Sequence, residues 1–376
     1  MSDNQGYMLA LSLPELGRLR MRGQRLAPRL PRARLVDAVK AVIGVQAQLP
    51  SAMELSLRAR VSDLASTDIE AARVQERTVV RTSCMRGTLH LVATDDLGWL
   101  LPLLAPGIIS GNARRSAQLG LDEQTYAKGM RVIHEALAAR GPLTRAELAQ
   151  QLASHGIDAS GQRAPYLVSR AAVEGNVCYG PDRGTEPTYV LLEDWAKLGP
   201  SLSREAALAE LAHRYLSAYG PAEPRDLAAW SGLPVREARA AWQLLADQLV
   251  ELKVAGQPLW MLAEQTAWLN EPLTDGPTVS LLPMFDTYLL GYKNRDLVVA
   301  PAHQGSIYHG GMMVPTVVVE GGAAGTWRYE RRGRQVHIEV TPFHPLNAEV
   351  RGLIVAEAAD VGRFLGPSFR LSYVEK

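Results

Sequence analysis

The chain has 376 residues, of which 47% are apolar and 21% are charged, and its formal net charge is +1. This length exceeds what one compact core usually supports, so we expect two or more globular domains. The near-neutral charge excludes a protein that is basic all over its surface, although a local basic patch remains possible.

The sequence predicts neither a targeting segment nor a disulfide-bonded or metal-binding pair of cysteines. No apolar run approaches the ~20 residues that span a bilayer, and the N-terminal stretch "MSDNQGYMLALSLPELGRLRMRGQRL" lacks the order of a signal peptide. We therefore expect a cytoplasmic protein without membrane contact. Cys84 and Cys178 lie far apart and have no metal-ligand spacing, so we expect no disulfide, no metal and no cofactor.

The first segment, residues 8–125, has helix-period runs from Pro14, Arg32 and Ile69, followed by the extended stretch "RTSCMRGTLHLVA". Gln46 and Gln48 lie within it, close to Pro50. Most glutamines simply face solvent. Residues two apart share a face only in an extended segment, so the two glutamines can act on one water molecule only if the pair is not helical. Pro50 favours this, because it disfavours the α conformation at Leu49.

The second segment, residues 126–200, has the element order of a winged helix. Gly141-Pro142 ends a first helix, and Thr144 with Glu147 forms a capping box for a second. The expected third helix and the two expected strands are Ala164–Glu174, Val177–Tyr179 and Thr188–Leu192.

The pattern recurs in residues 201–270. There "GPAEPRDLAAWSGL" corresponds to the earlier "GPLTRAELAQQLASHG", and "LVELKVAGQPLWML" predicts a hairpin. We therefore predict three tandem winged-helix units, at 8–125, 126–200 and 201–270.

Residues 271–376 contain Val/Thr-rich runs broken by glycine pairs, which predicts a small β-rich domain with hairpins. The predicted fold class is α+β, with three tandem winged-helix units followed by a small β-barrel-like C-terminal domain. Asp286 and Arg295 are expected to pair with each other at the mouth of that barrel.

Winged helices often read DNA with the third helix. In the second unit that helix offers only Arg170 as a basic side chain, so major-groove reading by it is not favoured. A non-enzymatic DNA-binding protein or transcriptional regulator is an alternative function, and it predicts a basic recognition helix.

Five segments in the same order resemble the winged-helix DNA glycosylases of the AlkZ/YcaQ type, over nearly the whole chain. They are Gln46-Ala47-Gln48, "RGTLHLV" (86–92), "YGPAEPRDLAAWSGL" (219–233), "LLPMFDTYLLGYKNRD" (281–296) and "GTWRYERRGRQVHIE" (325–339). The resemblance implies a monofunctional glycosylase that excises bulky N7-alkylguanine and unhooks interstrand crosslinks in double-stranded DNA, in repair or in self-resistance. We expect a monomer without a cofactor.

Within that family the catalytic signature is Gln, an apolar residue, then Gln or Asp, which Gln46 and Gln48 match in the Gln-x-Gln form. A glutamine amide takes no proton near neutral pH, but it can hold a water molecule. N7-alkylation gives the guanine a positive charge and makes it a good leaving group, so two amides are adequate for a cationic lesion and poor for a neutral base.

Candidate DNA-binding residues come from three places. In an extended "RGTLHLV" segment the side chains of Arg86, Thr88 and His90 would share one face, although a hydrogen-bonded structural role for the histidine is equally open. The others flank predicted turns that can enter a groove or simply face solvent: His303, His309, Arg331, Arg332 and Arg334. A family member that binds lesions without cutting is a further alternative.

Overall fold

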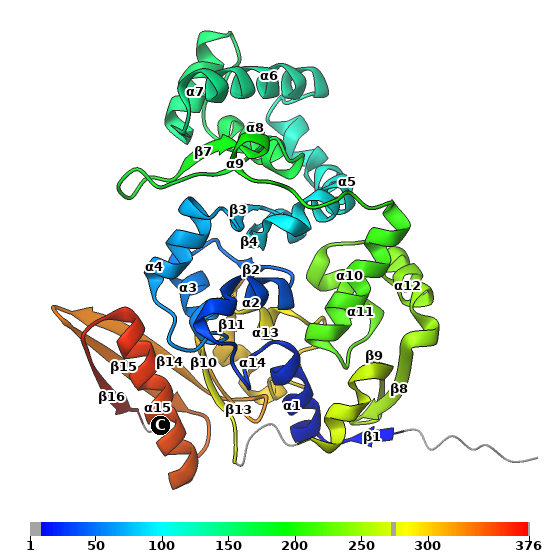
Figure 1. Cartoon of the computed structure of the whole chain (residues 1–376), viewed down its shortest axis with the longest axis vertical. Helices are drawn as coiled ribbons and strands as arrows, with labels where there is room; N and C mark the ends of the chain where they lie inside the picture. Colours follow the sequence, from blue (N-terminus) through cyan, green and yellow to red (C-terminus); the bar gives the residue numbers. More distant parts are fainter. Residues whose placement is uncertain (1–8, 272–275, 375–376) are drawn as a thin grey trace, which may run out of the picture.

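The computed structural model describes residues 9–271 and 276–374. Figure 1 shows three helix-rich regions along the first part of the chain and a strand-rich region, bearing the helix α15, at the C-terminal end. Within the described residues, no helix combines the length and the apolar character that crossing a bilayer requires.

The first segment alternates short helices and strands. Its helices are α1 (Leu13–Gly23), α2 (Leu35–Ala41), α3 (Pro50–Arg58) and α4 (Ser66–Glu70). Its strands are β1 (Leu9–Leu11), β2 (Val45–Gln46), β3 (Val79–Ser83) and β4 (Leu89–Ala93). The helix α3, which the sequence pattern did not predict, follows the two glutamines directly. The 25-residue helix α5 (Thr94–Gln118) then leads into the second segment.

The second segment contains the elements that the sequence predicted. The three helices are α6 (Glu123–Arg140), α7 (Arg145–Ser154) and α8 (Arg163–Val173), and the two strands are β6 (Val177–Tyr179) and β7 (Thr188–Leu191). The short elements β5 (Leu143–Thr144) and α9 (Leu192–Trp195) were not predicted. The capping box of α7 is present, because the Thr144 hydroxyl accepts from the Glu147 amide at 3.2 Å and the Thr144 amide donates to the Glu147 carboxylate at 2.7 Å.

The third segment has three helices and a hairpin: α10 (Arg204–Tyr219), α11 (Pro224–Ser231), α12 (Val235–Leu244), β8 (Leu249–Val254) and β9 (Gln257–Leu262). The N-terminal strand β1 pairs in parallel with β8, and Arg20 of α1 donates to the carbonyl oxygen of Pro221 at 2.7 Å. The N-terminal elements therefore pack on the third segment, although they belong to the first in sequence.

One six-stranded sheet joins the first and second segments, in the order β2-β4-β3-β6-β7-β5. The contact between them is the antiparallel pair β3–β6, at Arg81 and Tyr179. The two-residue strand β2 lies at one edge of this sheet, so its outer side has no strand neighbour among the described residues.

The C-terminal region contains an open five-stranded sheet, in the order β10-β13-β14-β15-β16. Its strands are β10 (Val279–Leu282), β13 (Thr316–Val319), β14 (Gly322–Arg332), β15 (Gln335–Pro342) and β16 (Ser368–Tyr373). The edge strands β10 and β16 do not pair with each other within the described chain, so the prediction of a barrel-like domain is wrong. The helix α15 (Ala348–Leu365) covers this sheet with Ile354 and Ala358.

Smaller elements complete this region: α13 (Thr287–Leu290), α14 (Pro301–Ile307), β11 (Tyr308–His309) and β12 (Met312–Met313). The predicted pair of Asp286 with Arg295 is wrong. Asp286 instead accepts from Arg60 at 2.8 Å, and both side chains are fully buried. The Arg295 guanidinium lies 3.9 Å from the centre of the Tyr308 ring. A buried carboxylate needs a buried cation, and Arg60 supplies it.

Candidate active site

Gln46 lies in the short strand β2 and Gln48 in the bend that follows it, between two helices. The helix α2 ends at Ala41, and Gln46 pairs with His90 in the antiparallel β2–β4 ladder. Leu49 is extended, with φ −109° and ψ 108°, and Pro50 is the first residue of α3. The condition for joint action is therefore met, because the pair is not helical. Pro50 does not end α2, because that helix has already ended at Ala41. It begins α3 instead.

The two amide side chains contact each other. The Gln46 Nε2 donates to the Gln48 Oε1 at 3.0 Å. Gln46 is 8% exposed, and its Oε1 has no hydrogen-bond partner in the part of the chain that the structure describes. Gln48 is exposed. The pair thus combines a buried hydrogen-bond acceptor, the Gln46 Oε1, with the exposed side chain of Gln48, which solvent and ligands can reach.

His90 is buried behind the pair. It is 2% exposed, and its Nδ1 contacts the carbonyl oxygen of Thr88 at 3.0 Å. Burial, with a smaller contribution from the Arg86 charge, lowers the pKa of His90 to about 3. The imidazole is therefore neutral and weakly basic at neutral pH, which fits a hydrogen-bonded structural role and leaves little surface for DNA.

Arg86 does not share a face with Thr88 and His90, contrary to the prediction for an extended segment. It lies in the tight turn Met85–Gly87 with φ +57°, and its guanidinium donates to the carbonyl oxygen of Trp230 in α11. The Thr88 hydroxyl donates to the Met85 carbonyl oxygen at 3.0 Å. The turn directs Arg86 toward the third segment, away from the histidine.

The predicted hairpin tip at Gly333 is present between β14 and β15, with φ +61° at the glycine. Arg331, Arg332 and Arg334 around it are exposed, and Arg332 pairs with Glu330 at 2.8 Å. Burial raises the pKa of Glu54 on α3, and the charges of Arg73 and Arg331 oppose that rise. The charge of Arg331 therefore acts on a side chain of α3, the helix that follows the two glutamines.

The two candidate histidines of the segment "AHQGSIYHGG" have different surroundings. His303 lies on α14, stacks on the Phe343 ring at a centroid distance of 4.1 Å, and contacts His344 at 3.2 Å. His309 is exposed and lies at the end of the hairpin β11–β12, whose turn is Gly310-Gly311. Of these two histidines, His309 is the one beside a hairpin turn.

The third helix of the second segment has little free positive charge to offer DNA. Arg170 on α8 donates to Glu123 at 2.9 Å, pairs with Glu174, and lies over the Tyr126 ring. Arg163, at the start of the same helix, donates to the Leu119 carbonyl oxygen at 2.7 Å and pairs with Asp158. These contacts agree with the expectation that α8 does not read a major groove.

Comparison with known proteins gives the family. A family model described as "DNA glycosylase AlkZ-like" matches residues 39–364. The chain belongs to the AlkZ-like DNA glycosylase family. It is therefore a DNA glycosylase, a hydrolase acting on N-glycosyl bonds, and the matched region includes Gln46 and Gln48.

Two comparisons support this assignment over almost the full length of the glycosylase. It is 30% identical over 371 residues to the interstrand DNA cross-link repair glycosylase of Streptomyces sahachiroi, covering 93% of this chain and 95% of the relative. The solved structure of the Streptomyces sahachiroi DNA glycosylase AlkZ superposes with a TM-score of 0.82 and 26% identity, over 97% of this chain and 100% of that one.

Arg81 of this glycosylase was not among the residues that the sequence predicted. It lies in the middle of β3, where every residue is buried, and its Nε donates to the carbonyl oxygen of Ala47 at 2.9 Å. An arginine inside an apolar strand is an unusual residue, because a buried cation must be paired. That anomaly in "TVVRTS" was the available signal, but the partner, distant in sequence, was not predictable from it.

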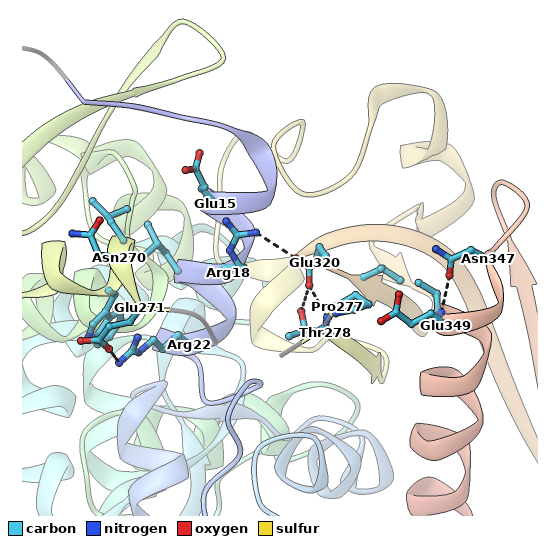
Figure 2. Close-up of a pocket in the computed structure, with 16 residues that line it drawn as sticks. Glu15, Arg18, Arg22, Asn270, Glu271, Pro277, Thr278, Glu320, Asn347 and Glu349 are labelled. Carbon is cyan, nitrogen blue, oxygen red and sulfur yellow. Dashed lines mark hydrogen bonds and ion pairs between the residues drawn. The ribbon is translucent and has the colours of Figure 1, made fainter. Parts of the chain in front are cut away.

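A cavity of about 830 Å³ lies apart from the glutamines. Figure 2 shows its polar side chains, from α1, from Asn270 and Glu271, and from the start of α15. Arg22 pairs with Glu271 at 2.5 Å, and Arg18 with Glu320 at 3.5 Å. The described lining residues include none of the predicted site residues, so this cavity is not the predicted active site of the glycosylase.

Potential metal ligands are scattered in this glycosylase. Among residues 9–271 and 276–374, no group of three or more His, Cys, Asp or Glu side chains is arranged to hold a metal ion.

Proposed function

We propose that this glycosylase hydrolyses the N-glycosidic bond of bulky or crosslinked N7-alkylguanine in double-stranded DNA, and that Gln46 and Gln48 form its active site. The observation that supports the proposal is the direct contact of the two side-chain amides, at 3.0 Å, with a buried Gln46 Oε1 that lacks a partner among the described residues. The relative named as an interstrand cross-link repair glycosylase supports this substrate class.

The two amides are suited to orient a water molecule. The hydrogen bond from the side-chain Nε2 of Gln46 to the side-chain Oε1 of Gln48 fixes the two side chains relative to each other. The side-chain Oε1 of Gln46 then accepts a hydrogen bond from water. This bond is favourable because a buried acceptor without a partner costs about 1–3 kcal/mol. Orientation of the nucleophile lowers the entropic part of the barrier.

The substrate supplies the charge that these side chains lack. As the C1′–N9 bond breaks, its electron pair neutralises the cationic N7-alkylguanine, and the sugar becomes oxocarbenium-like. The water oxygen then bonds to C1′ and the released proton passes to solvent. No general acid is required, and His90, with a pKa of about 3, is a poor base.

The DNA surface that we propose includes the exposed hairpin tips. Arg331, Arg332 and Arg334 would contact phosphates, and His309 would probe a groove, since exposed arginines and projecting turns are common in such contacts. We propose that the chain acts as a monomer.

We also propose a division into three tandem winged-helix units. The series of three helices and two strands in the second and third segments supports it. In the second segment the regulator alternative gains no support, because the basic residues of α8 are engaged by acidic side chains and a backbone carbonyl.

The test is base release from defined duplexes carrying N7-alkylguanine or a nitrogen-mustard crosslink. We expect the wild type to release the lesion, and Gln46→Ala and Gln48→Ala each to reduce the single-turnover rate by about 100-fold or more. Gln118→Ala is the matched control, because this exposed glutamine accepts a hydrogen bond from Arg115 at 3.0 Å and lies outside the proposed active site.

Two results would contradict the proposal. Release that survives both glutamine substitutions would remove Gln46 and Gln48 from the active site. Efficient release of uracil, a neutral base, would contradict the argument that the substrate must bring its own positive charge.

A further inference from the structure

Arg81 contacts the backbone of the Gln-Ala-Gln segment at its centre. The Arg81 Nε donates to the carbonyl oxygen of Ala47 at 2.9 Å, while the amide of Ala47 donates to the carbonyl oxygen of Leu89 at 2.7 Å. Both polar groups of Ala47 are thus engaged, one by the strand β4 and the other by an arginine side chain from β3. The residue between the two glutamines is held from two sides.

The bond to the Ala47 carbonyl is important because the strand β2 is so short. The ladder with β4 covers only Val45 and Gln46, and it is continued by the Ala47 amide. The next peptide plane, which joins Ala47 to Gln48, lies beyond that ladder. Its carbonyl oxygen is the atom that Arg81 binds, so Arg81 sets the direction in which Gln48 leaves the strand.

The other side of Arg81 rests on the second segment. Its guanidinium lies 4.6 Å from the centre of the Tyr179 ring on β6, and Arg81 and Tyr179 are also paired in the β3–β6 ladder. The Tyr189 hydroxyl on β7 donates to the Tyr179 hydroxyl at 3.0 Å. The arginine is therefore fixed by stacking on a tyrosine pair that the strands β6 and β7 hold in place.

We propose that Arg81 is a positioning residue for the glycosylase reaction, which aligns Gln46 and Gln48 by holding the Ala47 carbonyl. The inference rests on the proposed function, because it assigns the two glutamines to the active site. Arg81 is 8% exposed, so it has little surface with which to bind a phosphate. Its substitution therefore affects the rate of bond breaking and leaves DNA affinity unchanged.

The kinetic test compares Arg81→Lys and Arg81→Gln with the wild type. Lysine keeps the charge but lacks the planar Nε donor that reaches the carbonyl. We expect the single-turnover rate of base release at saturating enzyme to fall roughly 10- to 100-fold, because a misplacement of about 1 Å has effects of this size. The dissociation constant for lesion DNA should not change.

The matched control is Arg77→Lys. Arg77 also donates to a backbone carbonyl, that of Trp195 at 3.5 Å, and its guanidinium lies 4.1 Å from the centre of the Trp195 ring. These interactions lie outside the Gln-Ala-Gln segment, so we expect a wild-type rate. An Arg81→Lys protein with the wild-type rate would overturn the inference, and so would an effect confined to DNA affinity, which would make Arg81 a DNA-binding residue.

A second measurement does not depend on activity. The chain contains three Ala-Gln sequences, Ala47-Gln48, Ala117-Gln118 and Ala149-Gln150. Labelling alanine carbonyls with ¹³C and glutamine amides with ¹⁵N thus gives three carbonyl–amide correlations in an NMR spectrum, and Gln48→Ala identifies the first by its disappearance. Removal of the Arg81 bond should move the Ala47 carbonyl to lower frequency and leave the other two unchanged.

The two measurements separate the two proposals. A wild type that releases no base, combined with a shifted Ala47 carbonyl in Arg81→Lys and Arg81→Gln, overturns the proposed function and supports the hydrogen bond from Arg81. An unshifted Ala47 carbonyl overturns the positioning role, whatever the activity. Thermal unfolding of each variant establishes that the compared proteins are folded.

Discussion

The proposed active site depends on side chains that do not titrate. Gln46 and Gln48 carry no ionisable group. The buried imidazole of His90 belongs to the residue opposite Gln46 in the β2–β4 ladder. Burial lowers the pKa of that histidine to about 3, so its folded form is neutral over the physiological range. As the active site, this pair would restrict the enzyme to leaving groups that are already cationic, because neither amide can protonate the departing nucleobase.

A flat pH profile follows from this. We expect the single-turnover rate at saturating enzyme to vary little between about pH 6 and pH 9, since neither an amide nor a histidine with a pKa of about 3 changes protonation there. The measurement is base release from an N7-alkylguanine duplex across that range. A bell-shaped curve centred near neutral pH would show that a titrating acid or base takes part.

The DNA contact that we propose for the hairpin β14–β15 can be tested separately from the active site. Its tip carries three exposed arginines on both sides of Gly333: Arg331, Arg332 and Arg334. Changing all three to Gln should weaken binding to any duplex and reduce the slope of log affinity against log salt by about one for each phosphate that is no longer neutralised. The rate at saturating enzyme should stay near that of the wild type.

A matched control exists on the same strand. Arg328 is exposed, but its Nε pairs with Glu339 at 2.7 Å, so its charge is already compensated. Arg332 is likewise paired with Glu330, so the effect of the triple substitution should come mainly from Arg331 and Arg334. Arg328→Gln should therefore change the salt dependence much less than the triple substitution. An unchanged salt slope in the triple variant would show that this tip does not meet the DNA backbone.

Local signals predicted the helices and strands of the second segment, but they missed α3 in the first segment. Interactions between distant segments were not predicted. The capping box of Thr144 and Glu147 and the strand Val177–Tyr179 follow from residues a few positions apart, and both are present. The Arg81 bond to Ala47 joins two strands that are not neighbours in the sheet. The barrel prediction failed because sheet closure depends on which edges meet, and hairpin patterns do not encode that.

Buried arginines of the first segment bind residues of the C-terminal region and so join these two parts of the molecule. Arg58 on α3 donates to the Leu281 carbonyl oxygen at 2.9 Å and pairs with Asp360 of α15 at 3.1 Å. Arg60 binds Asp286, and the side chain of Ser56 donates to the same carboxylate at 2.6 Å. The region around the glutamines is thus fixed to the C-terminal region by arginines with no access to solvent.

The pair of Arg60 and Asp286 should therefore carry a large part of the stability of the folded chain. Asp286→Asn keeps the shape but leaves the Arg60 cation buried without its counter-charge, which should lower the free energy of unfolding by about 3–5 kcal/mol, measured with urea at pH 7. Glu330→Gln, which removes one partner of an exposed pair with Arg332, is the control and should have no measurable effect.

The destabilisation should also depend on pH in a defined direction. Burial raises the pKa of Asp286, but the Arg60 charge and the hydrogen bonds outweigh it, so the net pKa is below the ordinary value. A depressed folded pKa means that the stabilisation is complete above the unfolded pKa of about 3.9 and disappears as pH falls through the lower, folded value. The difference between wild type and Asp286→Asn should therefore be constant near neutrality and shrink below about pH 4. A difference that stayed constant down to the acid limit would mean that the carboxylate charge is not what stabilises the junction.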